Sequence, residues 1–158
     1  MIELNSKGGY VSEMNRLVSI VESNHLHTFV REMCAIACTE IFLAGERRYI
    51  GPDAKFGFHQ SGYKGRPHDT RWSIHEYMSS IDFRAKGLSE PFIGQALNTA
   101  YYDLWRPDVL ELKRSGFATA WCSDRGSEYR LQTTGRTEHD GTIFREVALQ
   151  RRRSRDVY

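Results

Sequence analysis

Apolar residues recur along this chain at spacings that predict strands and helices in alternation. A short apolar segment at 2–5 runs through a turn at 6–9 into residues 10–23, where apolar positions return every three or four residues. That stripe consists of Val11, Met14, Leu17, Val18 and Val21. Polar residues occupy the opposite side, so we expect a strand, a glycine turn and then an amphipathic helix.

The same order continues up to residue 121. We expect further strands at 28–33, 48–50, 55–59 and 117–121. We expect further helices at 35–44, 71–86, 91–104 and 107–114. Strands that alternate with helices are typical of an α/β domain with a largely parallel sheet. Beyond residue 121 the chain is polar and turn-rich, with a hairpin expected at 123–140 and a short strand at 142–149.

Composition fits one globular domain. The chain has 158 residues, of which 40% are hydrophobic and 12% aromatic, and this is enough for one core. No apolar run approaches the roughly 18 residues of a membrane span, so we expect no membrane partner. The net charge of +2 is too small to predict nucleic-acid binding. The basic cluster 151–155 is interpreted as a solvated terminus, with a polyanion contact as the alternative.

The cysteines and the start of the chain give little sign of a metal or of export. Three cysteines do not form a disulfide framework, and Cys34 and Cys38 have no second Cys or His pair at zinc-ligand spacing. We therefore expect no metal and no cofactor. No signal segment opens the sequence, so we expect a cytoplasmic protein. A signal peptide encoded upstream of Met1 would instead make it periplasmic or secreted.

Three short segments suggest chemistry when taken together. A strand that enters Gly8 and Gly9 before a helix presents backbone N–H groups to a developing negative charge. Small residues at 34–39 allow close backbone approach where a strand turns into a buried helix. His59 lies at the end of a short strand, where it can serve as a base. Each segment alone is more often structural, and only their combination favours an active site.

These segments, in this order and at these spacings, resemble the Clp-protease proteolytic subunit superfamily, and most nearly its stand-alone bacterial branch. The matching motifs are Asn5-Ser6-Lys7-Gly8-Gly9, Cys34-Ala35-Ile36-Ala37-Cys38 running into Phe42-Leu43-Ala44-Gly45, and Gly57-Phe58-His59. The resemblance implies a crotonase/Clp-protease-like spiral of strand-helix units. It also implies a core at 1–121 that lacks the superfamily's N-terminal strand-helix-strand portion, followed by a polar extension at 122–158.

The resemblance also implies a serine-peptidase site. Gly8 and Gly9 would supply oxyanion donors, position 36 the nucleophile and His59 the general base. For the acid that orients the base, Asp103 is the best match and Asp108 the second.

Two residues depart from the pattern. Lys7 replaces a proline of the glycine turn, and Ile36 replaces the nucleophilic serine. Isoleucine has no lone pair, so an acyl-enzyme cannot form at position 36. Cys38 and Thr39 are turned by about 200° and 300° from that position on a helix. Cys34 is expected to point back along the strand, so we do not expect a rescued nucleophile.

We therefore expect an impaired serine hydrolase that binds peptide or protein partners as a homo-oligomer. The apolar residues of the helix at 71–86 would serve subunit contact, as the resemblance implies, or else pack in the core. One alternative is a functional serine-type peptidase with a displaced nucleophile. A second is a crotonase-like acyl-CoA enzyme, which needs no serine but requires a carboxylate near the glycine turn, and the sequence shows none there.

Overall fold

The computed structural model describes the backbone of residues 1–62, 70–121, 129–137 and 143–151, and the side chains of residues 1–62 and 75–120. The strands are β1 (Ile2–Ser6), β2 (Thr28–Ala35), β3 (Arg48–Ile50), β4 (Lys55–Gly57), β5 (Ala120–Trp121), β6 (Tyr129–Thr137) and β7 (Ile143–Arg151). The helices are α1 (Val11–Ser23), α2 (Ala37–Leu43), α3 (Thr70–Ala85), α4 (Glu90–Asn98) and α5 (Val109–Arg114).

The strands form one mixed sheet in the order β5-β3-β2-β1-β7-β6, with β4 also pairing with β2. The pairs of β1 with β2, β2 with β3, β2 with β4, and β3 with β5 are parallel. Strand β2 pairs with β3 through its first half and with β4 through its second half. Strand β7 runs antiparallel to both β1 and β6. The predicted α/β class with a largely parallel sheet is confirmed.

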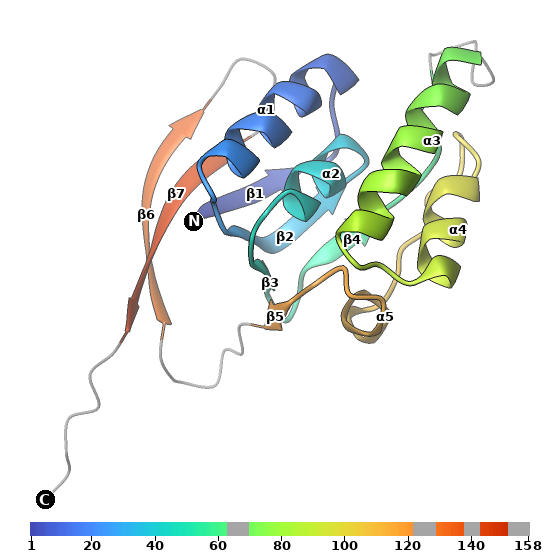
Figure 1. Ribbon diagram of the computed structural model, residues 1–158. Helices are drawn as coiled ribbons and strands as arrows, with labels where there is room; N and C mark the ends of the chain where they lie inside the picture. The colour runs from blue at the N-terminus through green and yellow to red at the C-terminus, as the bar shows by residue number, and fades with distance from the viewer. Residues whose placement is uncertain (63–69, 122–128, 138–142, 152–158) are drawn as a thin grey trace, which may run out of the picture.

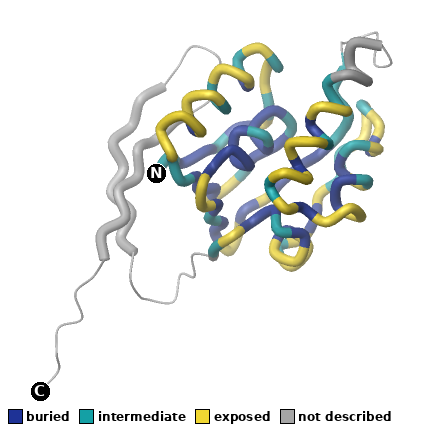
Figure 2. The backbone as a smooth tube through the Cα atoms, viewed as in Figure 1, coloured by how far each residue is buried: buried dark blue, intermediate teal, exposed yellow. Residues whose placement is uncertain are grey.

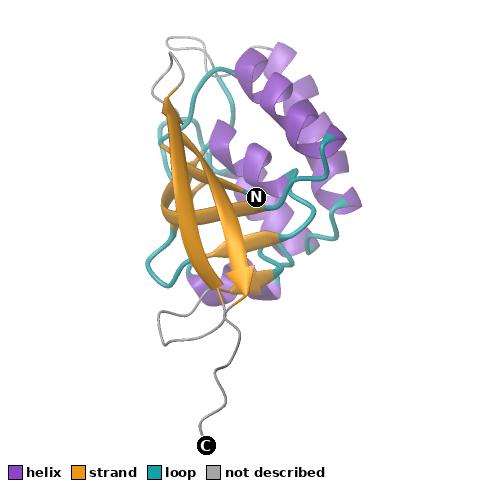
Figure 3. Ribbon diagram, turned by 90° about the vertical axis from the view of Figure 1, so that its left-hand side faces the viewer, coloured by secondary structure: helices purple, strands orange, loops and turns teal. Residues whose placement is uncertain are grey.

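Helices cover the sheet on the side where the glycine turn leads into α1. In Figure 1, α1 and α2 lie in front of β1 and β2, while α3 and α4 lie to their right. The turned view of Figure 3 shows the helices to one side of the strands and the hairpin of β6 and β7 facing the viewer. Within the described residues, no helix is long and apolar enough to cross a membrane.

Helix α2 is the centre of the core. Six of its seven residues are buried, and the burial map shows it within the dark central region (Figure 2). The rings of Phe42, Phe56 and Phe117 pack there with centroids 5.0 to 5.3 Å apart. The hydroxyl of Thr28 donates to the carbonyl of Phe42 at 2.8 Å near the end of the helix. A Cβ on Gly45 would overlap that hydroxyl oxygen, so this position requires glycine.

One predicted helix ends early. The sequence predicts a helix over 91–104, whereas α4 ends at Asn98 and Thr99 is extended, with φ −67° and ψ 122°. The residues that follow pair instead with the segment after β4. Gln60 N–H donates to Thr99 O at 2.8 Å, and Phe58 and Trp105 exchange two backbone hydrogen bonds of 2.9 Å. These long-range bonds replace the last turns of the predicted helix and fix the backbone on both sides of His59.

Candidate active-site cleft

The glycine turn after β1 is closed by Ser6. Gly8 has φ +122°, a conformation that favours glycine. The Gly8 N–H donates to the Ser6 Oγ at 3.2 Å, and the Ser6 hydroxyl donates to the Gly8 carbonyl at 3.1 Å. In this conformation the Gly8 N–H is already used within the turn, although the sequence predicts it as an oxyanion donor.

Ile36 lies at the turn that joins β2 to α2, and its backbone conformation is unusual. Its dihedral angles are φ 56° and ψ −120°, which are those of the first central residue of a type II′ turn, normally a glycine. A β-branched residue there costs on the order of 1–3 kcal/mol. The surrounding structure holds it in place, because Ile36 N–H donates to Gly57 O and Thr39 N–H donates to Ile36 O, both at 2.9 Å.

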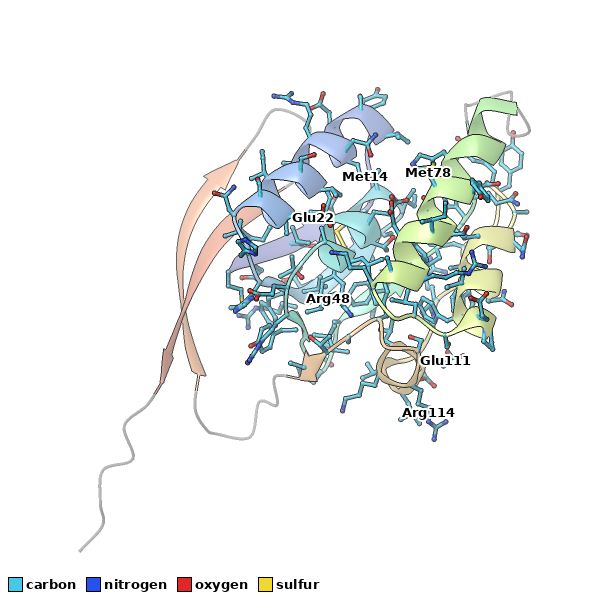
Figure 4. All side chains as sticks on the ribbon, viewed as in Figure 1. Met14, Glu22, Arg48, Met78, Glu111 and Arg114 are labelled. Carbon is cyan, nitrogen blue, oxygen red and sulfur yellow. A yellow bond between two sulfur atoms is a disulfide. The ribbon has the colours of Figure 1, made fainter. Side chains whose placement is uncertain are left out.

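A disulfide brackets this turn. Cys34 at the end of β2 and Cys38 in α2 are bonded, with Cα atoms 5.2 Å apart, and the yellow bond beside α2 marks the pair in Figure 4. Both residues are buried, at 0% and 2% exposure. The sequence expectation that Cys34 points back along the strand is wrong, because its sulfur is bonded to that of Cys38 in α2.

His59 follows β4 and is half-buried. Its Nδ1 lies 2.6 Å from the Gln60 carbonyl oxygen. A carbonyl only accepts, so this contact places the proton on Nδ1 and leaves the lone pair on Nε2, as a general base requires. The ring also packs edge-on against Tyr101, with centroids 5.4 Å apart.

The two predicted orienting acids lie elsewhere. Asp103 is exposed in the segment between α4 and Trp105, and it does not line the cavity that contains His59. Asp108 caps α5, since its carboxylate accepts from Glu111 N–H at 2.8 Å. In this conformation a backbone carbonyl, that of Gln60, holds the His59 ring.

One cavity brings four of the predicted site residues together. It has a volume of about 220 Å³, and its lining includes Gly8, Gly9, Ile36 and His59. We refer to it as the site cavity. Its apolar wall includes Val11, Met14, Phe83 and Leu97. The glycine turn, the turn at position 36 and the end of β4 therefore converge although they come from three separate strands.

A polar chain that the sequence motifs did not predict lines another part of the site cavity. Ser61 Oγ lies 3.3 Å from His75 Nδ1, and His75 Nε2 lies 4.0 Å from Glu40 Oε1. Ser79 donates to the same Glu40 oxygen at 3.1 Å. All four residues line the cavity. We refer to them as the Glu40 cluster.

Burial shifts the pKa values of both titratable members of the Glu40 cluster. Desolvation raises the pKa of Glu40 to about 7, against the opposing hydrogen bond from Ser79 and with a smaller contribution from the Asp82 charge. Desolvation also lowers the pKa of His75. The pair therefore favours neutral forms, and Glu40 changes its charge near neutral pH.

Comparison with solved structures identifies the fold. ClpP1 from Listeria monocytogenes is similar with a TM-score of 0.64 and 19% sequence identity, over 78% of this chain and 72% of the other. A point mutant of ClpP1 from the same organism gives a TM-score of 0.61 and 20% identity over 78% and 72%. The fold is ClpP-like. No protein-family model and no curated protein matches the sequence, so the likeness is one of three-dimensional structure.

Cys38 and Thr39, which follow position 36 closely in the sequence, are both engaged in other contacts. The sulfur of Cys38 is in the disulfide. Thr39 is buried, and its hydroxyl donates to the Ile36 carbonyl at 2.6 Å. The Ser61 hydroxyl lies beside the His75 imidazole. Burial lowers the pKa of His75 and so weakens it as a base. Within the described part of the chain, no group of three or more metal-binding side chains lies together.

A wider groove adjoins the site cavity of this ClpP-like fold. It has a volume of about 1160 Å³ and shares Lys7 and Gly8 with the site cavity. Its other walls come from the end of β2, the segment 52–56 and the segment 106–109. The glycine turn therefore lines both hollows.

Proposed function

We propose that this protein uses a Clp-protease-like scaffold to bind peptide or protein segments without cleaving them efficiently. The single observation that carries this proposal is Ile36 at the turn where the resemblance implies the nucleophile. The turn keeps the backbone conformation of a strained hydrolase turn, but its side chain cannot attack a carbonyl. Residual acceleration from binding and backbone donors reaches about 10³-fold in enzymes that lack their triad, so weak hydrolysis is compatible with the proposal.

A peptide is the ligand class that the surface supports best. The site cavity offers an apolar wall and a histidine held by backbone bonds. The adjoining groove offers charged and apolar residues beyond the glycine turn. An extended chain longer than one residue can lie across both, with a side chain entering the site cavity.

Fluorescence anisotropy with fluorescein-labelled casein tests this proposal, with gel analysis of the same samples for cleavage. We expect saturable binding and no fragments. Leucine at Gly9 provides a blocking variant, because a Cβ there meets no atom within 4 Å and the residue lines the site cavity. Gly94→Leu is the matched control, since Gly94 is equally open and lies on α4 outside the cavity. Binding that is absent, or that Gly9→Leu leaves unchanged, contradicts the proposal.

A second candidate is crotonase-like chemistry on an acyl-CoA thioester, and one observation favours it. The sequence showed no carboxylate near the glycine turn, whereas Glu40 lines the same cavity as Gly8 and Gly9. It ranks second because the Gly8 N–H is bonded to Ser6 and the Ile36 side chain lies against Gly8. Turnover of acetyl-CoA or crotonyl-CoA that disappears in Glu40→Gln would favour this candidate over peptide binding.

We also propose that the protein acts as a homo-oligomer through α3. Three large side chains on its described part are exposed, namely Tyr77 at 66%, Met78 at 51% and Ile81 at 42%. Their spacing places them along one stripe of the helix, a pattern typical of a contact surface.

A further inference from the structure

The carboxyl group of Glu40 lies in the site cavity, and among the described residues no lysine or arginine pairs with it. Its hydrogen-bond donor is the Ser79 hydroxyl, and its nearest ring nitrogen, that of His75, lies 4.0 Å away. Lys86, in the adjoining hollow, pairs with Glu22 at 2.9 Å. The Glu40 side chain keeps 22% of its surface exposed, so a ligand in the cavity can reach it.

We propose that Glu40 is the floor of a subsite that binds one basic side chain of the ligand, a lysine or an arginine. This inference rests on the peptide-binding function proposed above. The methylene stem of such a side chain would contact the apolar wall formed by Met14, Phe83 and Leu97, while its charged end would meet the Glu40 carboxylate.

Other charged groups around Glu40 favour a cation over an anion. Glu76, on α3, lines the same cavity. The charge of Asp82, also on α3, acts on Glu40. Among the described residues, the basic ones that line the cavity are Lys7, His59 and His75, and Lys7 belongs to the glycine turn. The hollow on the other side of Glu40 adds the Glu22–Lys86 ion pair, whose charges offset each other. The Asp82 charge therefore adds to that of Glu40 and favours a cation there.

The subsite makes binding depend on pH in a defined direction. The pKa of Glu40 is about 7 in the free protein, so the carboxyl is mostly neutral at pH 6 and mostly ionised at pH 8. A cationic side chain prefers the ionised form, so affinity should rise about tenfold from pH 6 to pH 8. Protonation of His75 at low pH acts in the same direction, and Glu40→Gln isolates that contribution because it retains His75.

The experiment compares N-acetylated, C-amidated, fluorescein-labelled peptides that differ at one central residue. Lysine, arginine and norleucine versions are titrated at pH 6 and pH 8 into the wild-type protein, Glu40→Gln and Glu76→Gln. We expect the basic peptides to bind at least tenfold more tightly than the norleucine peptide at pH 8. That preference should disappear in Glu40→Gln and persist, though reduced, in Glu76→Gln. Acetylation ensures that a terminal ammonium cannot imitate the basic side chain.

Ser79→Ala provides a second variant. The Ser79 hydrogen bond lowers the pKa of Glu40, so its removal should move the midpoint of lysine-peptide binding to higher pH without abolishing binding at pH 9. Equal affinity of the lysine and norleucine peptides in the wild-type protein would overturn the subsite and leave the proposed peptide binding intact. Failure of every peptide to bind would overturn both.

Discussion

A Cβ atom placed on Gly8 would lie 3.1 Å from both the Cβ and the Cδ1 of Ile36. The isoleucine side chain therefore packs directly against the glycine turn. In the hydrolase-like site proposed above, it would fill the space where a carbonyl meets the backbone donors. Isoleucine at position 36 would then both lack a nucleophile and obstruct the hole.

Serine-reactive probes should not label the wild-type protein. A fluorophosphonate needs an activated hydroxyl, and position 36 has none. We expect no stoichiometric adduct by intact mass spectrometry after incubation with a fluorophosphonate. An adduct that maps to Ser61 or Thr39 would contradict this prediction and identify a displaced nucleophile.

The sequence predicted the parts of the fold and site that depend on local motifs. The glycine turn, the turn at 34–38 and His59 all follow from short patterns, and the structure brings them to one cavity. The Glu40 cluster did not follow from any motif, because Glu40 and Ser79 lie 39 residues apart and meet only when α2 packs near α3.

The disulfide was missed for a related reason. A spacing of four residues carries no pairing signal by itself. The turn at Ile36, with its positive φ, lies between the two cysteines, and residue types alone did not reveal that backbone conformation.

The disulfide gives a prediction of thiol content and of stability. We expect the protein, when it is purified from an oxidising compartment, to lack free thiols at Cys34 and Cys38, because both are bonded and buried. Cys34→Ala/Cys38→Ala should lower the free energy of unfolding by about 2 kcal/mol, the value expected for a disulfide that closes so short a loop. Urea denaturation with and without reductant measures it. A reductant effect of the same size in the double variant would show another cause.

Helix α3 gives a prediction of assembly. Met78→Glu/Ile81→Glu should convert an oligomer to a monomer, because both side chains are exposed at 51% and 42% and would bring charge into the contact. Light scattering at micromolar concentration measures the change. Leu110→Glu on α5 is a control, since Leu110 is also 50% exposed. A wild-type protein that is already monomeric would contradict the proposed oligomer.

Glu40 should make the wild-type protein less stable as the pH rises. Its pKa is about 7 when folded, against an ordinary value of 4.5 for a glutamate in the unfolded chain. Between these values the folded protein holds a proton that the unfolded chain has released, so the free energy of unfolding falls with rising pH. The loss should amount to about 3 kcal/mol between pH 4.5 and pH 7. Urea denaturation of the wild type and Glu40→Gln at pH 5 and pH 8 isolates it, because the glutamine cannot titrate.

Ile36→Ser should restore measurable esterase or peptidase activity. The change removes the side chain that packs against Gly8 and supplies a hydroxyl in the same cavity as His59. Loss of the β-branch should also relieve part of the backbone strain at φ 56°. Hydrolysis of 4-nitrophenyl acetate and labelling by a fluorophosphonate measure the gain.

Second substitutions assign the roles within that restored site. The gain should vanish in Ile36→Ser/His59→Ala, because nucleophile and base act as a unit. If Asp103 rotates inward to orient His59, Ile36→Ser/Asp103→Ala should lose most of the gain, while Ile36→Ser/Asp108→Ala should keep it once folding is verified. Equal activity of the two aspartate variants would instead assign the orienting role to the Gln60 carbonyl, which already accepts from His59 Nδ1 at 2.6 Å. A folded Ile36→Ser protein that neither reacts with the probe nor cleaves the ester would show that the hole itself is lost, since the Gly8 N–H remains bonded to Ser6.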